Sequence, residues 1–236
     1  MKDGVAAFAP SSNFRPPSSL APAVGEHLQM AGGRDINAMM RRLKAPQRRE
    51  QLIEVATKLF AKWGYEATTT AAIAEAAGVT EPILYRHFDS KQELFVAIVR
   101  SVSEQTLRHW AEILDGIADP QEQIRRIAGE FPEHVRHLSD AYHVIHGALA
   151  TSRDRKVVAV MKEHYAQIEK FFVDIIAKGQ ASGVFRPQLD PKGPAWQLIM
   201  TGIGYAMIAL NLQPPEQGLI KNAIESILRG ISILKV

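Results

Sequence analysis

Apolar residues recur at every third or fourth position through most of the chain after Pro46, which is the spacing of helices with one buried face. The first such stretch, over about 46–63, carries an apolar stripe made of Leu52, Ile53, Ala56, Leu59 and Phe60. We find no alternating pattern long enough for a strand and no internal repeat. The pattern therefore predicts an all-α fold.

Cap and turn residues divide this periodic region into separate helices. Gly64 ends the first helix, and Thr70 is expected to cap a short second one. A short third helix is expected over 81–87, and a long fourth helix, through residue 114, begins at Asp89 or Ser90. Later apolar periods predict helices over about 120–138 with a kink at Pro132, 140–150, 154–181, 191–211 and 216–234.

Residues 1–44 lack this period and contain four prolines among serine, alanine and glycine. Such a segment buries too little apolar surface to offset its ordering entropy, so we expect a disordered leader. Its end is basic, because the stretch from Arg34 to Arg49 holds six basic residues and one acid, Asp35. A basic arm ahead of a folded module is typical of nucleic-acid binding, although a solvated tail has the same composition.

Composition narrows the class of protein only moderately. The chain of 236 residues is 46% hydrophobic and 22% charged with a net charge of +3, as in ordinary globular proteins. It has no cysteine, which excludes disulfides and thiolate zinc sites and fits a cytoplasmic location. The most apolar stretch, 198–210, has thirteen residues, fewer than the roughly 20 that span a bilayer. We therefore expect a buried helix there and no membrane segment.

The spacing of residues 67–88 predicts a helix-turn-helix. Two short helices are joined by a three-residue turn that begins at Gly78. A small residue, Ala74, lies in the first helix, and Val79 follows the glycine to lock the two helices together. In such motifs the second helix enters the major groove of DNA.

Residues 46–98 resemble the N-terminal domain of the tetracycline-repressor (TetR) family. The resemblance is carried by the linked motifs of 56–79 and 84–94, which read AxxLFAxxGYEATTTxxIAxxAGV and LYRHFxSKxEL. It implies a DNA-binding domain over 45–98 and a helical ligand-binding and dimerisation domain over 99–236. It also implies a ligand-released repressor that acts as a homodimer on a palindromic DNA operator, with a small apolar effector and no cofactor.

The resemblance implies DNA contacts from twelve residues: Arg48, Arg49, Thr69, Thr70, Thr80, Glu81, Pro82, Ile83, Tyr85, Arg86, His87 and Lys91. Phosphate contacts are expected from Tyr85 and Lys91, and base contacts from the run 80–83. Glu81 departs from the common family pattern, and two interpretations stay open. Its carboxylate either accepts a hydrogen bond from a cytosine amino group or only favours the helix N-terminus.

The larger C-terminal region offers candidates for a ligand pocket, although an aromatic or methionine stripe is equally consistent with plain core. The pocket candidates are Trp110, Phe131, Tyr142, His146, Met161, Tyr165, Phe172, Trp196 and Met200. For a dimer interface built from the last two helices, the candidates are Ile203, Met207, Ile220, Ile224, Ile227 and Ile231. The alternative is that these apolar side chains are buried within one subunit.

Four histidines, His134, His137, His143 and His146, fall within thirteen residues. This spacing suits a transition metal, but no cysteine assists, so we expect scattered histidines and no metal site. The chain has no phosphate-binding glycine loop, no HExxH and no GxSxG, so an enzyme is not expected. A helical adaptor without specific DNA binding is the alternative function.

Overall fold

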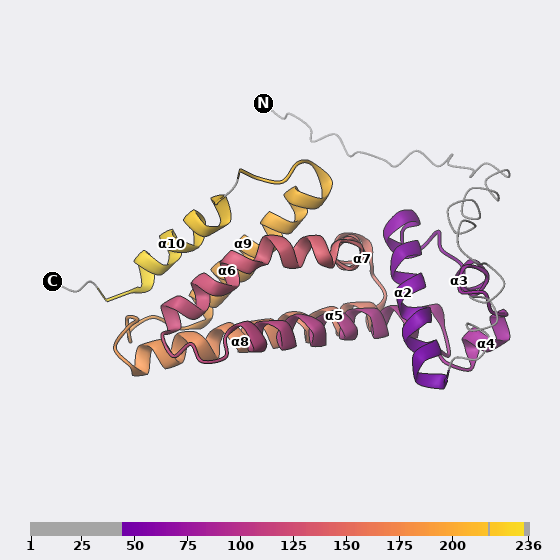
Figure 1. The fold of residues 1–236 in the computed structure, drawn as a ribbon, viewed down its shortest axis with the longest axis horizontal. Helices are drawn as coiled ribbons and strands as arrows, with labels where there is room; N and C mark the ends of the chain where they lie inside the picture. The colour runs from indigo at the N-terminus through magenta and orange to yellow at the C-terminus, as the bar shows by residue number, and fades with distance from the viewer. Residues whose placement is uncertain (1–43, 217, 234–236) are drawn as a thin grey trace, which may run out of the picture. The chain divides into compact units, whose positions relative to one another are not determined.

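The computed structural model describes residues 44–216 and 218–233, which form nine helices. The expected disordered leader and the basic residues before Lys44 lie outside these residues. The helices are α2 (Ala45–Trp63), α3 (Thr70–Ala76), α4 (Glu81–Tyr85), α5 (Lys91–Ile113), α6 (Pro120–His137), α7 (Ser139–Thr151), α8 (Arg155–Ala181), α9 (Lys192–Asn211) and α10 (Leu219–Ile231) (Figure 1). The prediction of an all-α fold is confirmed. None of the described helices is both long and apolar enough to span a membrane.

Side-chain caps explain where several helices begin. Thr69, rather than the expected Thr70, caps α3, because its hydroxyl accepts a hydrogen bond from the Ala72 amide at 3.1 Å. Ser90 caps α5 by accepting from the Glu93 amide, while the Glu93 carboxylate accepts from the Asp89 amide. Helix α4 ends at Tyr85, two residues earlier than expected, and α6 continues through Pro132.

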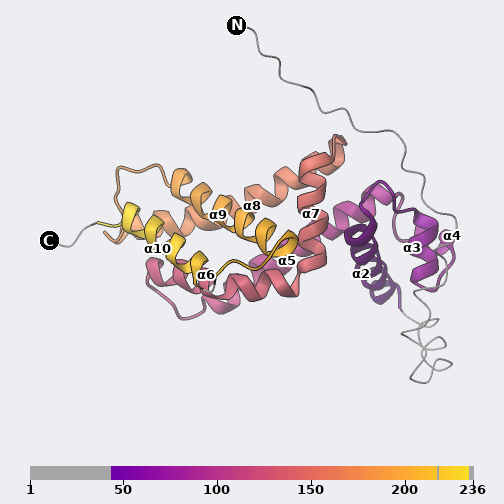
Figure 2. The ribbon, with the colours of Figure 1, turned by 90° about the horizontal axis from the view of Figure 1, so that it is seen from above.

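The long helices α5 and α8 pack along each other, and α9 packs on α8 (Figure 1). Helix α10 packs against α6 and α9, as the second view also shows (Figure 2). Helix α7 packs on α2 and also contacts α5, α8 and α9. Helix α7 therefore contacts the helix that precedes the helix-turn-helix as well as the C-terminal bundle.

Two clusters of buried apolar side chains form the core. The first joins α2, α3, α4 and the first half of α5 to α7 and the start of α8, where Ala141, Ile145 and Met161 contribute. The second joins the end of α5 to α6, α9, α10 and the rest of α8, with Trp110 at one side. The first cluster thus combines residues from both sides of the expected domain boundary after residue 98.

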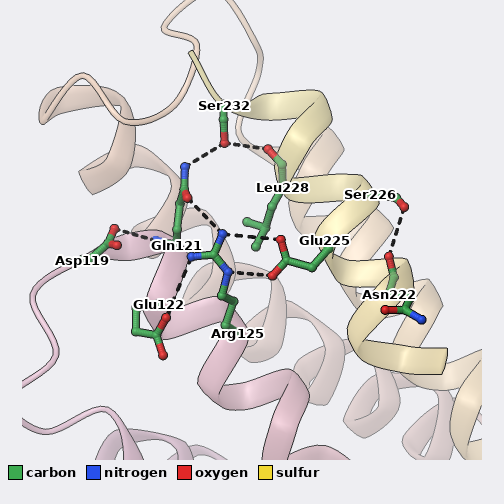
Figure 3. A network of polar contacts seen from close by, with 9 residues as sticks. All are labelled: Asp119, Gln121, Glu122, Arg125, Asn222, Glu225, Ser226, Leu228 and Ser232. Atoms are coloured by element: carbon green, nitrogen blue, oxygen red, sulfur yellow. Dashed lines mark hydrogen bonds and ion pairs between the residues drawn. The ribbon is translucent and has the colours of Figure 1, made fainter. Parts of the chain in front are cut away.

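A polar network fixes α10 against α6 (Figure 3). The Arg125 guanidinium donates to both carboxylate oxygens of Glu225, with Nε 2.6 Å from Oε1. The Gln121 amide donates to the Ser232 hydroxyl at 2.8 Å, and that hydroxyl donates to the Leu228 carbonyl. A bidentate arginine–carboxylate contact fixes geometry as well as adding energy, so α10 has a defined position on the bundle.

The end of α10 is also held by the segment after α8. The Arg186 amide donates to the Ile231 carbonyl at 2.9 Å, beside an isolated antiparallel bridge between Phe185 and Ser232. The buried Phe185 ring lies directly on Gly179 of α8. A Cβ atom at residue 179 would lie 2.1 Å from Cδ2 of Phe185, so only glycine leaves room for the ring.

Candidate nucleic-acid interface and buried cavity

The helix-turn-helix is held by a tight turn and a small apolar core. Gly78 adopts φ +66°, in the left-handed region that favours glycine, and the next amide, of Val79, donates to the Ala74 carbonyl at 2.9 Å. Ala77 and Leu84 are fully buried beneath the two helices. The opposite side of α4 stays accessible, as a groove-reading helix requires.

Three of the implied DNA contacts meet on this accessible side. The Thr70 hydroxyl donates to Oε1 of Glu81 at 2.5 Å and lies 3.2 Å from the Tyr85 hydroxyl. Tyr85 is 46% exposed. The Glu81 carboxylate is engaged inside the motif, which favours its role in positioning the start of α3 against α4 over a role as a base reader.

Lys91 does not point into solvent as a phosphate contact would. Its ammonium donates to three backbone carbonyls, those of Tyr65 at 2.8 Å, Glu66 at 3.3 Å and Thr68 at 3.1 Å. It also lies 4.4 Å from the centroid of the Tyr65 ring. An ammonium has three N–H donors, so all of them are used within the protein. In this structure Lys91 therefore ties the α2–α3 loop to α5, and its phosphate contact stays a prediction.

The two arginines of α2 lie in different surroundings. Arg48 is buried, and its guanidinium donates to the Gln51 side chain, whose amide in turn donates to the Ala77 carbonyl. Arg49 is exposed, with its guanidinium carbon 4.8 Å from the centroid of the Phe88 ring. Arg48 therefore supports the end of α3, and only Arg49 keeps an accessible charge.

The remaining implied DNA contacts surround α4. Thr69, Thr80, Pro82 and Arg86 are exposed, whereas Ile83 and His87 are half-buried. Burial, followed by the charges of Arg86, Arg48 and Arg49, lowers the pKa of His87 below its ordinary value. The site around His87 is therefore electropositive, which suits a phosphate backbone.

A cavity of about 70 Å³ lies inside the second core cluster, between α5, α6, α7, α8, α9 and α10. Six of the expected pocket residues line it: Trp110, Phe131, Tyr142, His146, Tyr165 and Phe172. Three do not. Met161 belongs to the first core cluster, and Trp196 and Met200 are exposed on α9. Sequence reasoning missed His164 of α8, a lone histidine on an apolar helix face.

The expected dimer residues divide into two groups. Ile220, Ile224 and Ile231 are buried within the subunit, because α10 turns its apolar stripe toward α6 and α9. The structure thus agrees with the alternative for these three, burial within one subunit, and the first two also line the cavity. Ile203, likewise in the cavity wall, and Ile227 are half-buried, while Met207 is 42% exposed.

Two buried histidines each lie within hydrogen-bond distance of a hydroxyl of α5, and one of them, His164, also lines the cavity. Nδ1 of His164 is 2.6 Å from the Ser103 hydroxyl, and Nε2 of His134 is 3.0 Å from the Thr106 hydroxyl. Burial lowers the pKa of each histidine to about 4, so both are neutral at pH 7. Burial also raises the pKa of Tyr165 to about 12.

The four histidines of 134–146 occupy separate surroundings. His143 bonds through Nδ1 to the Ser139 carbonyl of its own helix, at 3.0 Å, while His146 faces the cavity. No group of three or more metal-ligating side chains gathers within the part of the chain that the structure describes.

The sequence of this chain is similar to those of known bacterial transcriptional regulators. Residues 52–98 match the family model described as bacterial regulatory proteins, tetR family. The chain is 29% identical over 143 residues to the HTH-type transcriptional repressor KstR2 of Mycobacterium tuberculosis, a match that covers 61% of this chain and 72% of that protein. It is 33% identical over 115 residues to the transcriptional activator FasR of Mycolicibacterium smegmatis, covering 49% of this chain and 51% of that protein.

Solved structures agree with the fold. The ketosteroid transcriptional regulator KstR2 of Mycobacterium tuberculosis superposes with a TM-score of 0.60 at 25% identity, over 79% of this chain and 96% of that chain. The regulator FadR of Bacillus subtilis, solved with stearoyl-CoA, superposes with a TM-score of 0.66 at 18% identity, over 77% of this chain and 98% of that chain. At 18% identity, the similarity to FadR concerns the fold alone.

Proposed function

Since the chain belongs to the TetR family of DNA-binding transcriptional regulators, we propose that it is a repressor whose dimer leaves a palindromic operator when a small apolar molecule binds. The observation that carries the proposal is that one chain joins a helix-turn-helix with an accessible α4 to a buried apolar cavity. The KstR2 relative is a repressor, whereas FasR is an activator. The longer match to KstR2 favours repression.

DNA reading is assigned to residues 45–98. In this assignment, α4 enters the major groove, with Thr80, Pro82 and Ile83 facing base edges. Tyr85 and Arg49 contact phosphates, and Thr69 and Arg86 face the backbone beside them. In this assignment the protein binds DNA in the cytoplasm, and its function requires no catalytic step.

The ligand-binding and dimerisation domain is assigned to residues 99–236. One face of α9 carries exposed apolar side chains, among them Met200, Met207 and Ile208. Gly204 lies on the same face and has open space around it, so a second helix can approach closely. A two-fold pairing of this face would place two α4 helices on two half-sites, which is why we propose a homodimer.

The cavity is assigned to the effector. Apolar pockets with a few polar groups are typical of small-molecule sites, but their volumes commonly reach about 300–1,000 Å³. A cavity of about 70 Å³ is smaller than this range, so in this proposal it widens when the ligand binds. Widening moves α7, because Ile145 lines the cavity and also belongs to the core cluster that supports α2. A ligand that favours the widened form would thereby bias the DNA-binding helices.

Fluorescence anisotropy with DNA from upstream of the chain's own gene tests the proposal. We expect a nanomolar to submicromolar dissociation constant with a steep salt dependence, and a dimer in analytical ultracentrifugation. Ile208→Glu should yield monomers and weak DNA binding, while Leu149→Glu, which changes an exposed leucine on α7, should leave both unchanged. Binding without salt dependence or sequence preference would favour the adaptor alternative instead.

A further inference from the structure

One buried nitrogen in the cavity wall has no hydrogen-bond partner within the described part of the chain. His146 of α7 is 7% exposed, and its Nδ1 atom is buried without a donor or acceptor beside it. The neighbouring buried histidines are different, since His134 and His164 each bond to a hydroxyl of α5. Buried polar atoms are almost always paired in folded proteins, so an unpaired one that faces a cavity points to a missing partner.

The surroundings of His146 define what that partner can be. The cavity is lined by apolar and aromatic residues, two histidines and two tyrosines, with no lysine, arginine, aspartate or glutamate. Burial, and then the charge of His143, lowers the pKa of His146, so the ring is neutral at pH 7. An ionised group placed here would have no opposite charge, and burying an unpaired charge is strongly unfavourable.

The remaining lining residues of the cavity are mostly apolar, which favours a ligand with an apolar carbon skeleton. The Tyr142 ring lies 5.7 Å from the His146 ring, centroid to centroid, and flanks it on the same helix. The histidines and tyrosines of the wall all belong to α7 and α8, whereas the lining residues from α6, α9 and α10 are apolar. The Trp110 ring of α5 packs against the Phe172 ring, with centroids 5.3 Å apart. A bound molecule would therefore meet hydrogen-bonding groups mainly on the α7 and α8 side.

We propose that the effector is an uncharged, largely apolar molecule whose hydroxyl or carbonyl oxygen hydrogen-bonds Nδ1 of His146. A hydroxyl would donate to Nδ1 in one neutral tautomer of the ring, and a carbonyl would accept from it in the other. This inference rests on the proposed function, in which the cavity holds the effector. It adds the chemical class of the molecule and the residue that selects it.

Four six-membered-ring probes of similar size test the proposal: methylcyclohexane, cyclohexanol, cyclohexanone and cyclohexanecarboxylate. Binding is followed by the fluorescence of Trp110, with Trp63→Phe and Trp196→Phe introduced so that Trp110 is the only tryptophan. We expect cyclohexanol or cyclohexanone to bind about tenfold more tightly than both the hydrocarbon and the carboxylate.

Variants of His146 connect this preference to the nitrogen. His146→Leu should abolish the preference, and His146→Asn, which keeps a hydrogen-bonding group near the Nδ1 position, should restore part of it. His143→Leu, on the same helix but outside the cavity wall, should leave the preference unchanged. Because His146→Leu removes an unpaired nitrogen, its melting temperature should equal or exceed that of the wild type.

The proposal is overturned if no probe binds, if the carboxylate binds most tightly, or if the preference survives in His146→Leu. DNA anisotropy on the same samples separates this result from the proposed function. Normal DNA binding and release by another apolar compound, without any preference for the oxygenated probes, would overturn only the assignment of His146. If the wild-type protein without ligand does not bind DNA, the proposed function itself is overturned.

Discussion

The ammonium of Lys91 lies 2.8 Å from the carbonyl oxygen of Tyr65, on a residue 26 positions earlier in the chain. Two more carbonyls of the same loop accept from it, so a single side chain caps the turn between α2 and α3. Lys91, whose place in the motif of 84–94 suggested a phosphate contact, thus has a structural role in this chain.

Lys91→Met should therefore lower the free energy of unfolding by about 1–3 kcal/mol, because charge-assisted hydrogen bonds are lost and three carbonyls need new partners. We expect Lys91 to keep these bonds on DNA, so the slope of DNA affinity against salt should stay unchanged. Chemical denaturation and anisotropy measure the two quantities. Lys178→Met, on the exposed side of α8, is the control. A slope lower by about one with unaltered stability would restore the phosphate assignment.

Glu81→Gln should leave the preferred operator sequence unchanged, because the amide oxygen can still accept the hydrogen bond from Thr70. Glu81→Ala should weaken binding to all sequences by several-fold, since it removes the link between α3 and α4. Selection from randomised DNA reports both results. A shift from cytosine toward adenine at one position in Glu81→Gln would instead identify Glu81 as a base reader.

Stability should fall as the pH drops from 6.5 toward 4. The pKa of His164 is lowered by burial from 6.5 to about 4, so the unfolded chain binds more protons in this window. The free energy of unfolding reaches its full value above pH 6.5, and the lowered pKa of one such histidine accounts for about 3 kcal/mol of it relative to pH values below 4. Urea unfolding of His164→Gln should show a correspondingly smaller loss between pH 7 and 4.5, with His143→Gln as the control. Equal pH dependence in His164→Gln and the wild type would show that His164 titrates normally.

Gly179→Ala should destabilise the fold by about 1–3 kcal/mol, because the new methyl group would overlap the Phe185 ring. Gly147→Ala is a matched control in another helix, where an added Cβ meets nothing within 4 Å. It should be neutral or stabilising by up to about 1 kcal/mol. Thermal unfolding distinguishes the two substitutions. Equal effects would mean that the Phe185 ring moves aside without cost.

The helices themselves could be predicted from the sequence because caps, glycines and periodicity are local properties. The cap of α3 was misplaced by one residue, since Thr69 and Thr70 have the same chemistry and only the backbone decides between them. Periodicity also shows that α10 buries the face with Ile220 and Ile224, but it does not show against what. Of the two alternatives for that face, a partner subunit or the same subunit, the structure shows burial against α6 and α9 of the same subunit.

The polar details of the candidate site depend on contacts between distant residues. No local pattern indicates that Lys91 folds back onto Tyr65, or that His164 pairs with Ser103, 61 positions away. The six pocket residues found from sequence are aromatic or histidine side chains on apolar faces, whereas Met161, chosen from the same kind of face, lies elsewhere. Which apolar face surrounds a cavity is a property of the assembled bundle.

The first core cluster makes the folding of the α2–α5 region depend on residues of α7 and α8. Ala141 and Ile145 of α7 and Met161 of α8 bury the apolar side chains of the α2–α5 region. A fragment cut after residue 98 would expose that surface to water, so we expect it to aggregate or unfold. Chimeric regulators that exchange DNA specificity should therefore carry α7 and the first turns of α8 together with the helix-turn-helix, although these segments lie far from it in the sequence.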